Sequence, residues 1–300
     1  MNRVDGLLLL DKPAGMTSNR ALQTVRRLLR AKKAGHTGSL DPAATGMLPL
    51  CFGEATKVCA FLLDSDKTYR VTAKLGVATN TGDADGEETA TAEVPELSAE
   101  QWDRLLQEFL GDSMQVPPMY SALKMDGKRL YELARKGETV EREPRPIRID
   151  EIQLLEAAAS RLVFRVKCSK GTYIRSLVED IAAKAGTVAH TARLHRESVG
   201  DFLPQDTLDL DKVTALADAG ELEQHLLSPD VALTALHGVQ LDAEAAQKFR
   251  SGQAVEATAD AASGLARVYG GDEVFLGVGE LSGDGWLHPR RVFRPPEDGL

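Results

Sequence analysis

The sequence predicts a globular protein that combines helices and strands, with a separate small β region at its C-terminal end. Three observations support this prediction. Hydrophobic residues make up 43% of the 300 residues and charged residues 27%, a composition typical of a folded chain rather than a disordered one. Strand-like runs alternate with amphipathic helical segments over the first 200 residues. After about residue 230, glycine becomes frequent and turns separate short apolar runs.

The N-terminal elements follow a strand, helix, loop order. The apolar run over residues 4–10 predicts a buried strand, which the turn at 12–15 ends. Ser18 is placed to cap a helix over 19–30, because apolar residues recur there at helical spacing. A loop rich in glycine, proline and threonine follows over 35–46.

The middle of the chain continues the alternation. We expect helices over 55–63, 98–110, 130–135 and 173–184, and strands over 67–75, 147–155, 162–168 and 194–202. Residues 98–101 form a capping box, which marks the start of the second of these helices. Residues 112–148 contain eight Lys/Arg and little periodicity, so they predict a long, mostly irregular insertion.

Several classes of protein are excluded at this level. The longest aliphatic run, residues 7–10, is too short to cross a bilayer and is not followed by a signal-peptide cleavage site. The three cysteines (Cys51, Cys59 and Cys168) cannot form a disulfide framework and lack the spacing of a zinc site. We therefore expect a reduced, cytoplasmic protein with no metal site and no membrane association.

The charge distribution is asymmetric. The net charge is −9, yet residues 1–57 carry +5 and residues 201–300 carry −11. A basic end points to an anionic partner such as nucleic acid. The alternative is an ordinary amphipathic helix with a solvated basic face, and charge alone favours this alternative.

The loop over residues 35–46, called here the signature loop, is the most unusual segment. It holds three glycines, His36 and Asp41, and Pro42 stiffens the backbone after Asp41. Asp41 is thus a carboxylate on a rigid turn with space beside it. Taken singly, an Asp before Pro is usually only a turn residue. The start of the loop also resembles a nucleotidyl-transferase motif, but the second histidine of that motif is missing.

The whole loop, together with its neighbours, resembles the TruB-type tRNA pseudouridine synthases, which modify uridine 55 in the T-loop of tRNA. The matching motifs, in the family's order and spacing, are Lys12-Pro13-x-Gly15-x-Thr17-Ser18, the signature loop, Lys67-x-Tyr69-Arg70, Gly82-Asp83-Ala84-x-Gly86, residues 117–124 and residues 170–177. The resemblance is strong over residues 1–200 and weaker over the last 60–70 residues.

The resemblance implies an α+β fold with a mixed, mainly antiparallel sheet, followed by a small PUA-like β-barrel. It divides the chain into a catalytic domain over 1–232, with a thumb insertion over about 112–148, and a PUA-like RNA-binding domain over 233–300. The partner that it implies is tRNA, bound through the T-loop and stem. We expect no guide RNA, and nothing in the sequence suggests more than a monomer.

The resemblance also implies a role for each matched residue. Asp41 stands where the family has its catalytic nucleophile, and Arg175 where an arginine pairs with it. Substrate-binding positions are implied for His36, which helps hold the flipped-out conformation, for Tyr69, which stacks on the uracil, and for Tyr173 and Leu194, which line the base pocket. An arginine this close is expected to lower the pKa of Asp41 and keep it ionised.

The implied reaction breaks a C1′–N1 bond and makes a C1′–C5 bond, so it requires no cofactor and no metal. A carboxylate can receive the sugar while the uracil turns. Whether Asp41 attacks C1′ or removes a C2′ proton stays open. The target base must be flipped out of the RNA, at a cost that stacking and pocket contacts offset.

Basic side chains are candidates for contacts with the RNA backbone, because neutralised phosphates supply much of the affinity of such complexes. The candidates are Lys12, Arg27, Lys33, Lys124, Lys128 and Arg129. Two rival functions stay open. A guide-RNA-dependent synthase shares the signature loop, although the acidic C-terminal hundred residues argue against it. A tRNA-folding chaperone would bind the same RNA without needing the chemistry, and both roles can coexist.

Overall fold

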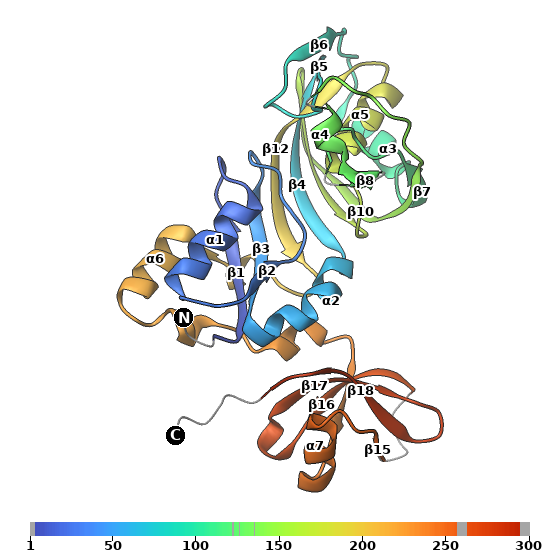
Figure 1. Cartoon of the computed structure of the whole chain (residues 1–300). Helices are drawn as coiled ribbons and strands as arrows, with labels where there is room; N and C mark the ends of the chain where they lie inside the picture. Colours follow the sequence, from blue (N-terminus) through green and yellow to red (C-terminus); the bar gives the residue numbers. More distant parts are fainter. Residues whose placement is uncertain (1–3, 122, 126, 135, 257–262, 295–300) are drawn as a thin grey trace.

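The computed structural model describes residues 4–121, 123–125, 127–134, 136–256 and 263–294. Within these residues the chain forms one large and one smaller sheet, with helices packed against both (Figure 1). No helix among them is both long and apolar enough to span a membrane.

The large sheet is mixed and mainly antiparallel. Its strands are β1 (Gly6–Lys12), β2 (Ala34–His36), β3 (Thr45–Phe52), β4 (Lys67–Leu75), β7 (Gly111–Gln115), β10 (Arg145–Ala158), β11 (Arg161–Cys168), β12 (Ala189–Val199) and β13 (Leu208–Asp209). They follow the order β13-β1-β3-β12-β4-β11-β10-β7, with β2 paired to β3 at the side. The pairs β1–β13 and β3–β12 are parallel, whereas the others are antiparallel. The predicted α+β fold is confirmed.

Helices cover the two halves of this sheet separately. The helices are α1 (Ser18–Leu28), α2 (Cys59–Asp64), α3 (Ala99–Gln107), α4 (Leu130–Ala134), α5 (Ile174–Lys184), α6 (Leu210–Asp218) and α7 (Ala243–Arg250). Short 3-10 helices are η1 (Gly53–Val58), η2 (Pro204–Asp206), η3 (Leu222–His225), η4 (Pro229–Leu233) and η5 (Gly271–Glu273). One hydrophobic cluster joins α1 and α6 to β1 and β3, and another joins α3 and α5 to β4, β10, β11 and β12. Two short hairpins, β5 (Val77–Thr79) with β6 (Glu88–Thr91) and β8 (Lys124–Met125) with β9 (Lys128–Arg129), complete this part.

The alternation of side chains along β4 leaves one face of the sheet open. Tyr69, Val71 and Ala73 point into the cluster beneath α5, as strand periodicity predicts. Arg70 and Thr72 therefore point to the opposite face, where Arg70 is exposed. This open face forms part of the candidate site.

The structure corrects several predicted boundaries. The N-cap of α1 is Thr17, whose hydroxyl accepts a hydrogen bond from the third helical residue, so the prediction of Ser18 was wrong by one position. The strand predicted over 194–202 begins at Ala189 and contains two register shifts, which obscure its period of two. The insertion over 112–148 is less irregular than predicted, because β7 and the start of β10 belong to the sheet.

The C-terminal part forms the predicted small β unit. Its strands are β14 (His237–Gln240), β15 (Val255–Glu256), β16 (Gly264–Tyr269), β17 (Phe275–Leu281) and β18 (Trp286–Val292). They form a five-stranded sheet in the order β14-β16-β17-β18-β15, which curls around a core that includes Phe249 of α7 (Figure 1). This curled sheet is consistent with a PUA-like domain, while the boundary at residues 232/233 stays a prediction.

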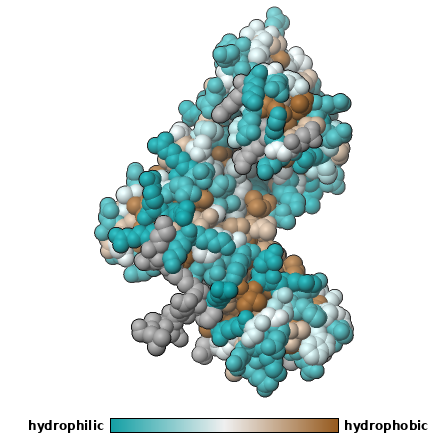
Figure 2. Space-filling model, viewed as in Figure 1, coloured by the Kyte–Doolittle hydropathy of each residue, from teal (hydrophilic) through white to brown (hydrophobic). Residues whose placement is uncertain are grey.

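An apolar junction connects the smaller sheet to the rest of the chain. Val58 and Leu233 pack against Val278 and Phe293. Lys57 strengthens the junction, since its Nζ donates to the carbonyl of Val292 at 2.6 Å. Figure 2 shows a mostly hydrophilic surface with apolar residues gathered where the smaller sheet meets the larger part.

Candidate active site

The signature loop is fastened to the N-terminal strand and helix. The Leu40 amide donates to Ser18 Oγ at 2.8 Å, and that hydroxyl donates to the Leu40 carbonyl at 3.1 Å. Lys12 Nζ donates to the Pro42 carbonyl at 3.3 Å. These contacts hold the residues on both sides of Asp41, so the carboxylate stands on a fixed backbone.

A buried arginine holds the two ends of the segment that carries Asp41. Arg196 is 1% exposed; its Nε donates to the Met47 carbonyl at 2.7 Å and its Nη2 to the Gly38 carbonyl at 3.0 Å. Gly46 packs so closely on β12 that a Cβ there would lie 2.2 Å from the Arg196 carbonyl oxygen. The segment between Gly38 and Met47 is thus fixed against β12 at both ends.

Arg175 contacts three other segments of the chain around the carboxylate of Asp41. Its Nε lies 3.1 Å from Asp41 Oδ2, and its Nη1 lies 3.5 Å from Asp83 Oδ2. The same guanidinium donates to the Thr81 carbonyl at 2.8 Å and to the Tyr120 carbonyl at 2.7 Å. Because a planar guanidinium offers five donors in fixed directions, this arrangement fixes the orientation of Arg175 toward Asp41.

The pKa of Asp41 is raised above its ordinary value, which reverses the predicted direction. Burial among the surrounding segments is the largest cause, and it outweighs the opposing effect of Arg175. The charges of Asp83 and Asp85 raise this pKa further, while Lys12 lowers it. The side chain of Asp41 still has 45% of its surface exposed, so the carboxylate is open to a substrate.

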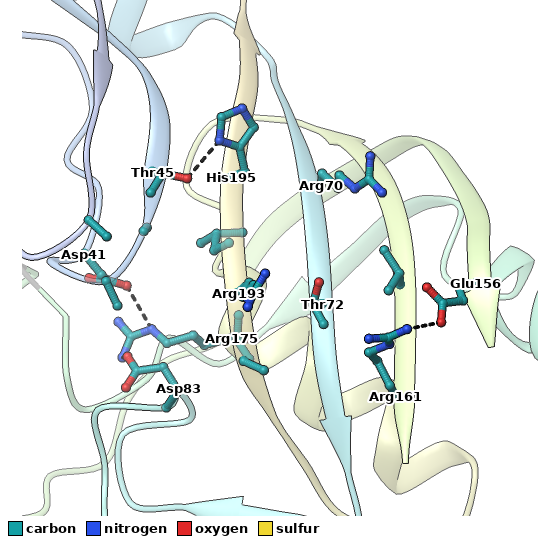
Figure 3. Close-up of a pocket in the computed structure, with 18 residues that line it drawn as sticks. Asp41, Thr45, Arg70, Thr72, Asp83, Glu156, Arg161, Arg175, Arg193 and His195 are labelled. Atoms are coloured by element: carbon teal, nitrogen blue, oxygen red, sulfur yellow. Dashed lines mark hydrogen bonds and ion pairs between the residues drawn. The ribbon is translucent and has the colours of Figure 1, made fainter. Parts of the chain in front are cut away.

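Asp41 lines a pocket of about 930 Å³ that has two different walls (Figure 3). The loop wall carries Asp41, Asp83 and Arg175. The sheet wall is the open face of β4, β11 and β12. Leu194 also lines the pocket, but from the other face of β12, where it lies opposite Val71 and packs against the cluster under α5. The remaining lining residues are Ala14, Ala43, Ala44, Thr45, Arg70, Thr72, Ala84, Glu156, Arg161, Val163, Thr191, Ala192, Arg193 and His195.

The other predicted substrate-binding residues lie around this pocket rather than on its surface. Tyr69 is 9% exposed and packs in the core under β4, and burial raises its pKa. Burial also raises the pKa of Tyr173. The charge of Arg175 lowers this pKa and the charge of Asp41 raises it. His36 lies on β2, does not line the pocket, and has an Nδ1 atom without a hydrogen bond among the described residues. The structure thus places Asp41, Arg175 and Leu194 together, with both tyrosines adjacent.

One of the predicted RNA-backbone contacts is contradicted. Lys12 is fully buried, and its Nζ donates to the carbonyls of Pro13 at 2.8 Å and Met16 at 2.9 Å as well as to that of Pro42. Burial lowers its pKa to about 8. An ammonium group enclosed by backbone carbonyls fastens the loop instead of meeting a phosphate. Exposed side chains are found at Arg27, Lys33, Lys124 and Lys128, and the side chain of Arg129 lies outside the described residues.

Three site residues have no assigned role in the sequence-based prediction. Asp83 belongs to the Gly82–Gly86 motif, which signalled a special loop without showing that its carboxylate meets Arg175. Arg196 gave no signal, because a basic residue in a strand is expected at the surface. His195 Nδ1 lies 2.8 Å from Thr45 Oγ1, a contact between residues that are 150 positions apart.

Two family models match the chain. The N-terminal domain of the TruB family of pseudouridylate synthases matches residues 26–174, and the C-terminal domain of pseudouridine synthase II TruB matches residues 238–293. The tRNA pseudouridine synthase B of Dechloromonas aromatica is 51% identical over 290 residues, which covers 97% of this chain and 96% of that protein. The chain belongs to the TruB family.

Other TruB-family proteins give the same result. The tRNA pseudouridine synthase B of Stutzerimonas stutzeri is 49% identical over 97% of this chain and 96% of that protein. The enzyme of the same name from Haemophilus influenzae strain KW20 is 49% identical over 92% of this chain and 89% of that protein.

Solved structures share the fold at lower identity. A Cbf5-Nop10-Gar1 complex contains a chain with a TM-score of 0.75 and 24% identity, covering 97% of this chain and 85% of that one. An H/ACA RNP bound to a substrate RNA containing 2′-deoxyuridine gives a TM-score of 0.74 at 23% identity, covering 97% and 86%. These matches show the pseudouridine synthase fold in this TruB-family chain.

Proposed function

We propose that this protein converts uridine to pseudouridine in tRNA, at position 55 of the T-loop, with Asp41 as the nucleophile. The observation that supports the proposal most directly is the half-open carboxylate of Asp41, fixed 3.1 Å from Arg175 at the wall of a large pocket. The high identity to proteins named tRNA pseudouridine synthase B gives the substrate class.

The geometry suits the bond changes of this isomerisation. The C1′–N1 bond breaks, the C1′–C5 bond forms, the proton on C5 leaves, and N1 gains a proton, so no atom is lost from the nucleotide. A carboxylate can either attack C1′ or remove the C2′ proton, and Asp41 is accessible for both. Arg175 stabilises the ionised form of Asp41 against the burial that raises its pKa.

The neighbouring side chains have proposed roles in holding the extruded base. Tyr69 stacks on the uracil once substrate opens its near-buried position, and its raised pKa keeps the phenol protonated. Tyr173 and Leu194 enclose the base from the sides. His36, on the strand before the signature loop, supports the flipped-out RNA conformation outside the pocket.

The proposed partner is tRNA alone. We expect a cytoplasmic monomer that recognises the T-loop and stem without a guide RNA and without a cofactor. The catalytic domain would comprise residues 1–232, with residues 112–148 closing over the RNA, and the PUA-like domain at 233–300 would contact the RNA outside the T-loop. Exposed Arg27, Lys33, Lys124 and Lys128, together with Arg129, are proposed to meet the backbone.

Incubation of the purified protein with a T-loop minihelix tests the function. Pseudouridine mapping should find one modified position, and a minihelix with cytidine at that position should yield no product. Failure on bare minihelix and bare tRNA, with activity restored only by an added guide RNA, would contradict the proposal. A tRNA-folding assay with wild type and Asp41→Asn separates a chaperone role from the chemistry.

A further inference from the structure

The sheet wall of the pocket carries an unusual row of basic side chains. In the strand register, His195 of β12 lies opposite Arg70 of β4, and Arg70 lies opposite Arg165 of β11. Arg193 stands two residues before His195 on β12, opposite Thr72. Like charges directly opposite each other on neighbouring strands, as at Arg70 and Arg165, destabilise a sheet. Such a row calls for a compensating negative group.

Three basic residues of β11 have that compensation within the protein. Arg165 Nε lies 2.7 Å from Glu197, and Lys167 Nζ lies 3.8 Å from Glu151. Arg161 pairs with a glutamate in the same way. The guanidinium groups of Arg70 and Arg193 have no hydrogen bond or ion pair to any of the residues that the structure describes, although both groups line the pocket and are exposed.

His195 is a neighbour of both arginines, opposite Arg70 and two residues along β12 from Arg193, and it is held in position. Its Nδ1 lies 2.8 Å from Thr45 Oγ1, at the point where β3 and β12 pair in parallel. When the Thr45 hydroxyl donates this hydrogen bond, the imidazole proton is on Nε2, which becomes available as a donor. Figure 3 shows His195, Arg70 and Arg193 on the sheet side of the pocket, across from Asp41.

We propose that Arg70, Arg193 and His195 form a phosphodiester-binding site. This inference rests on the proposed function, because it takes RNA as the ligand. Guanidinium groups bind phosphate through paired hydrogen bonds, and two unpaired guanidiniums beside an imidazole offer such donors to one or two adjacent phosphates.

The position of this site would orient the substrate. Asp41 and Asp83 repel phosphates from the loop wall, whereas the sheet wall attracts them. The RNA backbone next to the target nucleotide therefore lies on β4 and β12, and the sugar and base turn toward Asp41. The arginines contribute to binding and to this orientation, while the bond changes take place at the other wall.

Salt-dependent binding of a T-loop minihelix tests the site. We would compare Arg70→Ala, Arg193→Ala and His195→Ala, each in an Asp41→Asn background, so that binding is measured without turnover. Each arginine substitution should raise Kd by roughly 5- to 20-fold and reduce the slope of log Kd against log salt by about 0.7 to 0.9. His195→Ala should weaken binding less than either arginine substitution.

Arg165→Ala is the matched control. Arg165 lies opposite Arg70 on the same sheet and is also exposed, but it is paired with Glu197 and does not line the pocket. Its substitution should leave the Kd within about 2-fold and the salt slope unchanged. An equal effect of Arg165→Ala, or an unchanged slope in both Arg70→Ala and Arg193→Ala, would overturn the proposal.

Neutral phosphate analogues locate the contact. We would use a set of minihelices, each with one methylphosphonate near the target uridine. At one position the methylphosphonate should weaken binding by wild type, but it should not weaken binding by Arg70→Ala any further. If no position shows this non-additivity, the phosphate assignment is wrong. The two proposals can fail separately. If wild type forms pseudouridine but the arginine variants bind the minihelix normally, only the phosphate site is wrong. If wild type binds the minihelix in a salt-sensitive way but forms no pseudouridine, only the proposed function is wrong.

Discussion

The two walls of the pocket hold their charges in opposite ways. On the loop wall, Arg175 faces Asp41 and Asp83 and two backbone carbonyls, so its donors are occupied before substrate arrives. On the sheet wall, Arg70 and Arg193 are exposed and unpaired within the described part of the chain. Preorganised charges need little rearrangement during a reaction, whereas unpaired ones are free to bind an anion. The difference indicates that the loop wall serves the chemistry and the sheet wall serves binding.

The sharpest test of this division is Asp41→Asn. The amide keeps the size of the side chain but can neither attack C1′ nor accept a C2′ proton. We expect product formation to fall by at least about 10³-fold. Affinity for the minihelix should stay within a few-fold, because the sheet wall is intact. Single-turnover product analysis together with a binding titration measures both, and retained turnover would remove the nucleophile assignment.

Arg175→Lys should have the second-largest effect. Lysine keeps the positive charge, but one ammonium group cannot reach Asp41, Asp83 and two carbonyls from different segments at once. We expect kcat to fall by roughly 10²-fold with KM within a few-fold, whereas Arg70→Ala is expected to weaken binding. An effect on KM alone would mean that Arg175 binds substrate and that the division between the walls is wrong. Circular dichroism and thermal unfolding control for loss of structure.

The sequence could predict the loop wall better than the sheet wall. The order and spacing of motifs identified Asp41 and Arg175 and implied their pairing, which the structure shows at 3.1 Å. The direction of the Asp41 pKa was not predictable, because burial depends on segments that are distant in sequence. The sequence could not show that Arg70 is unpaired either, because pairing depends on which neighbouring strands carry a carboxylate within reach of it.

Buried basic residues account for the remaining differences between the sequence-based prediction of the site and the structure. Lys12 was assigned to the surface because lysine is almost always exposed, yet the carbonyls that surround it enclose its ammonium group. Arg196 lies next to a register shift between residues 196 and 198 of β12, so the alternation of this strand gave no guide to its direction. Both residues support the signature loop from beneath, where only tertiary structure shows a role.

The seam between the two walls, which is the short parallel pairing of β3 with β12, can be tested with Gly46→Ala. Thr45 and Gly46 pair with His195 and Arg196 of β12, and Gly46 has φ of +103°. A Cβ would meet the backbone of Arg196 at 2.2 Å, and backbone cannot move aside as a side chain can. We expect a loss of about 3–5 kcal/mol in the free energy of unfolding, measured by urea denaturation.

Gly15→Ala is the matched control for this seam. Gly15 also has a positive φ, of +81°, but a Cβ there would meet nothing within 4 Å. Its substitution should cost only the backbone strain, about 1–2 kcal/mol. Equal costs for the two variants would mean that the loop is not pressed against β12.

The smallest expected effect is a shift in pH dependence from Asp83→Asn. Asp41 acts as the carboxylate, so kcat/KM should fall as the pH drops through the pKa of Asp41 in the free protein. Asp83 raises that pKa through its negative charge. Removing the charge lowers the pKa, and the acid limb of the profile should therefore move to lower pH.

The limb is compared after each profile is scaled to its own plateau, so that a change in kcat does not imitate a shift. Asp85→Asn, which removes a smaller contribution of the same sign, should move the limb less. A limb that moves to higher pH in Asp83→Asn would show that Asp83 acts on Asp41 chiefly by orienting Arg175, and that the loop wall works through geometry more than through its summed charge.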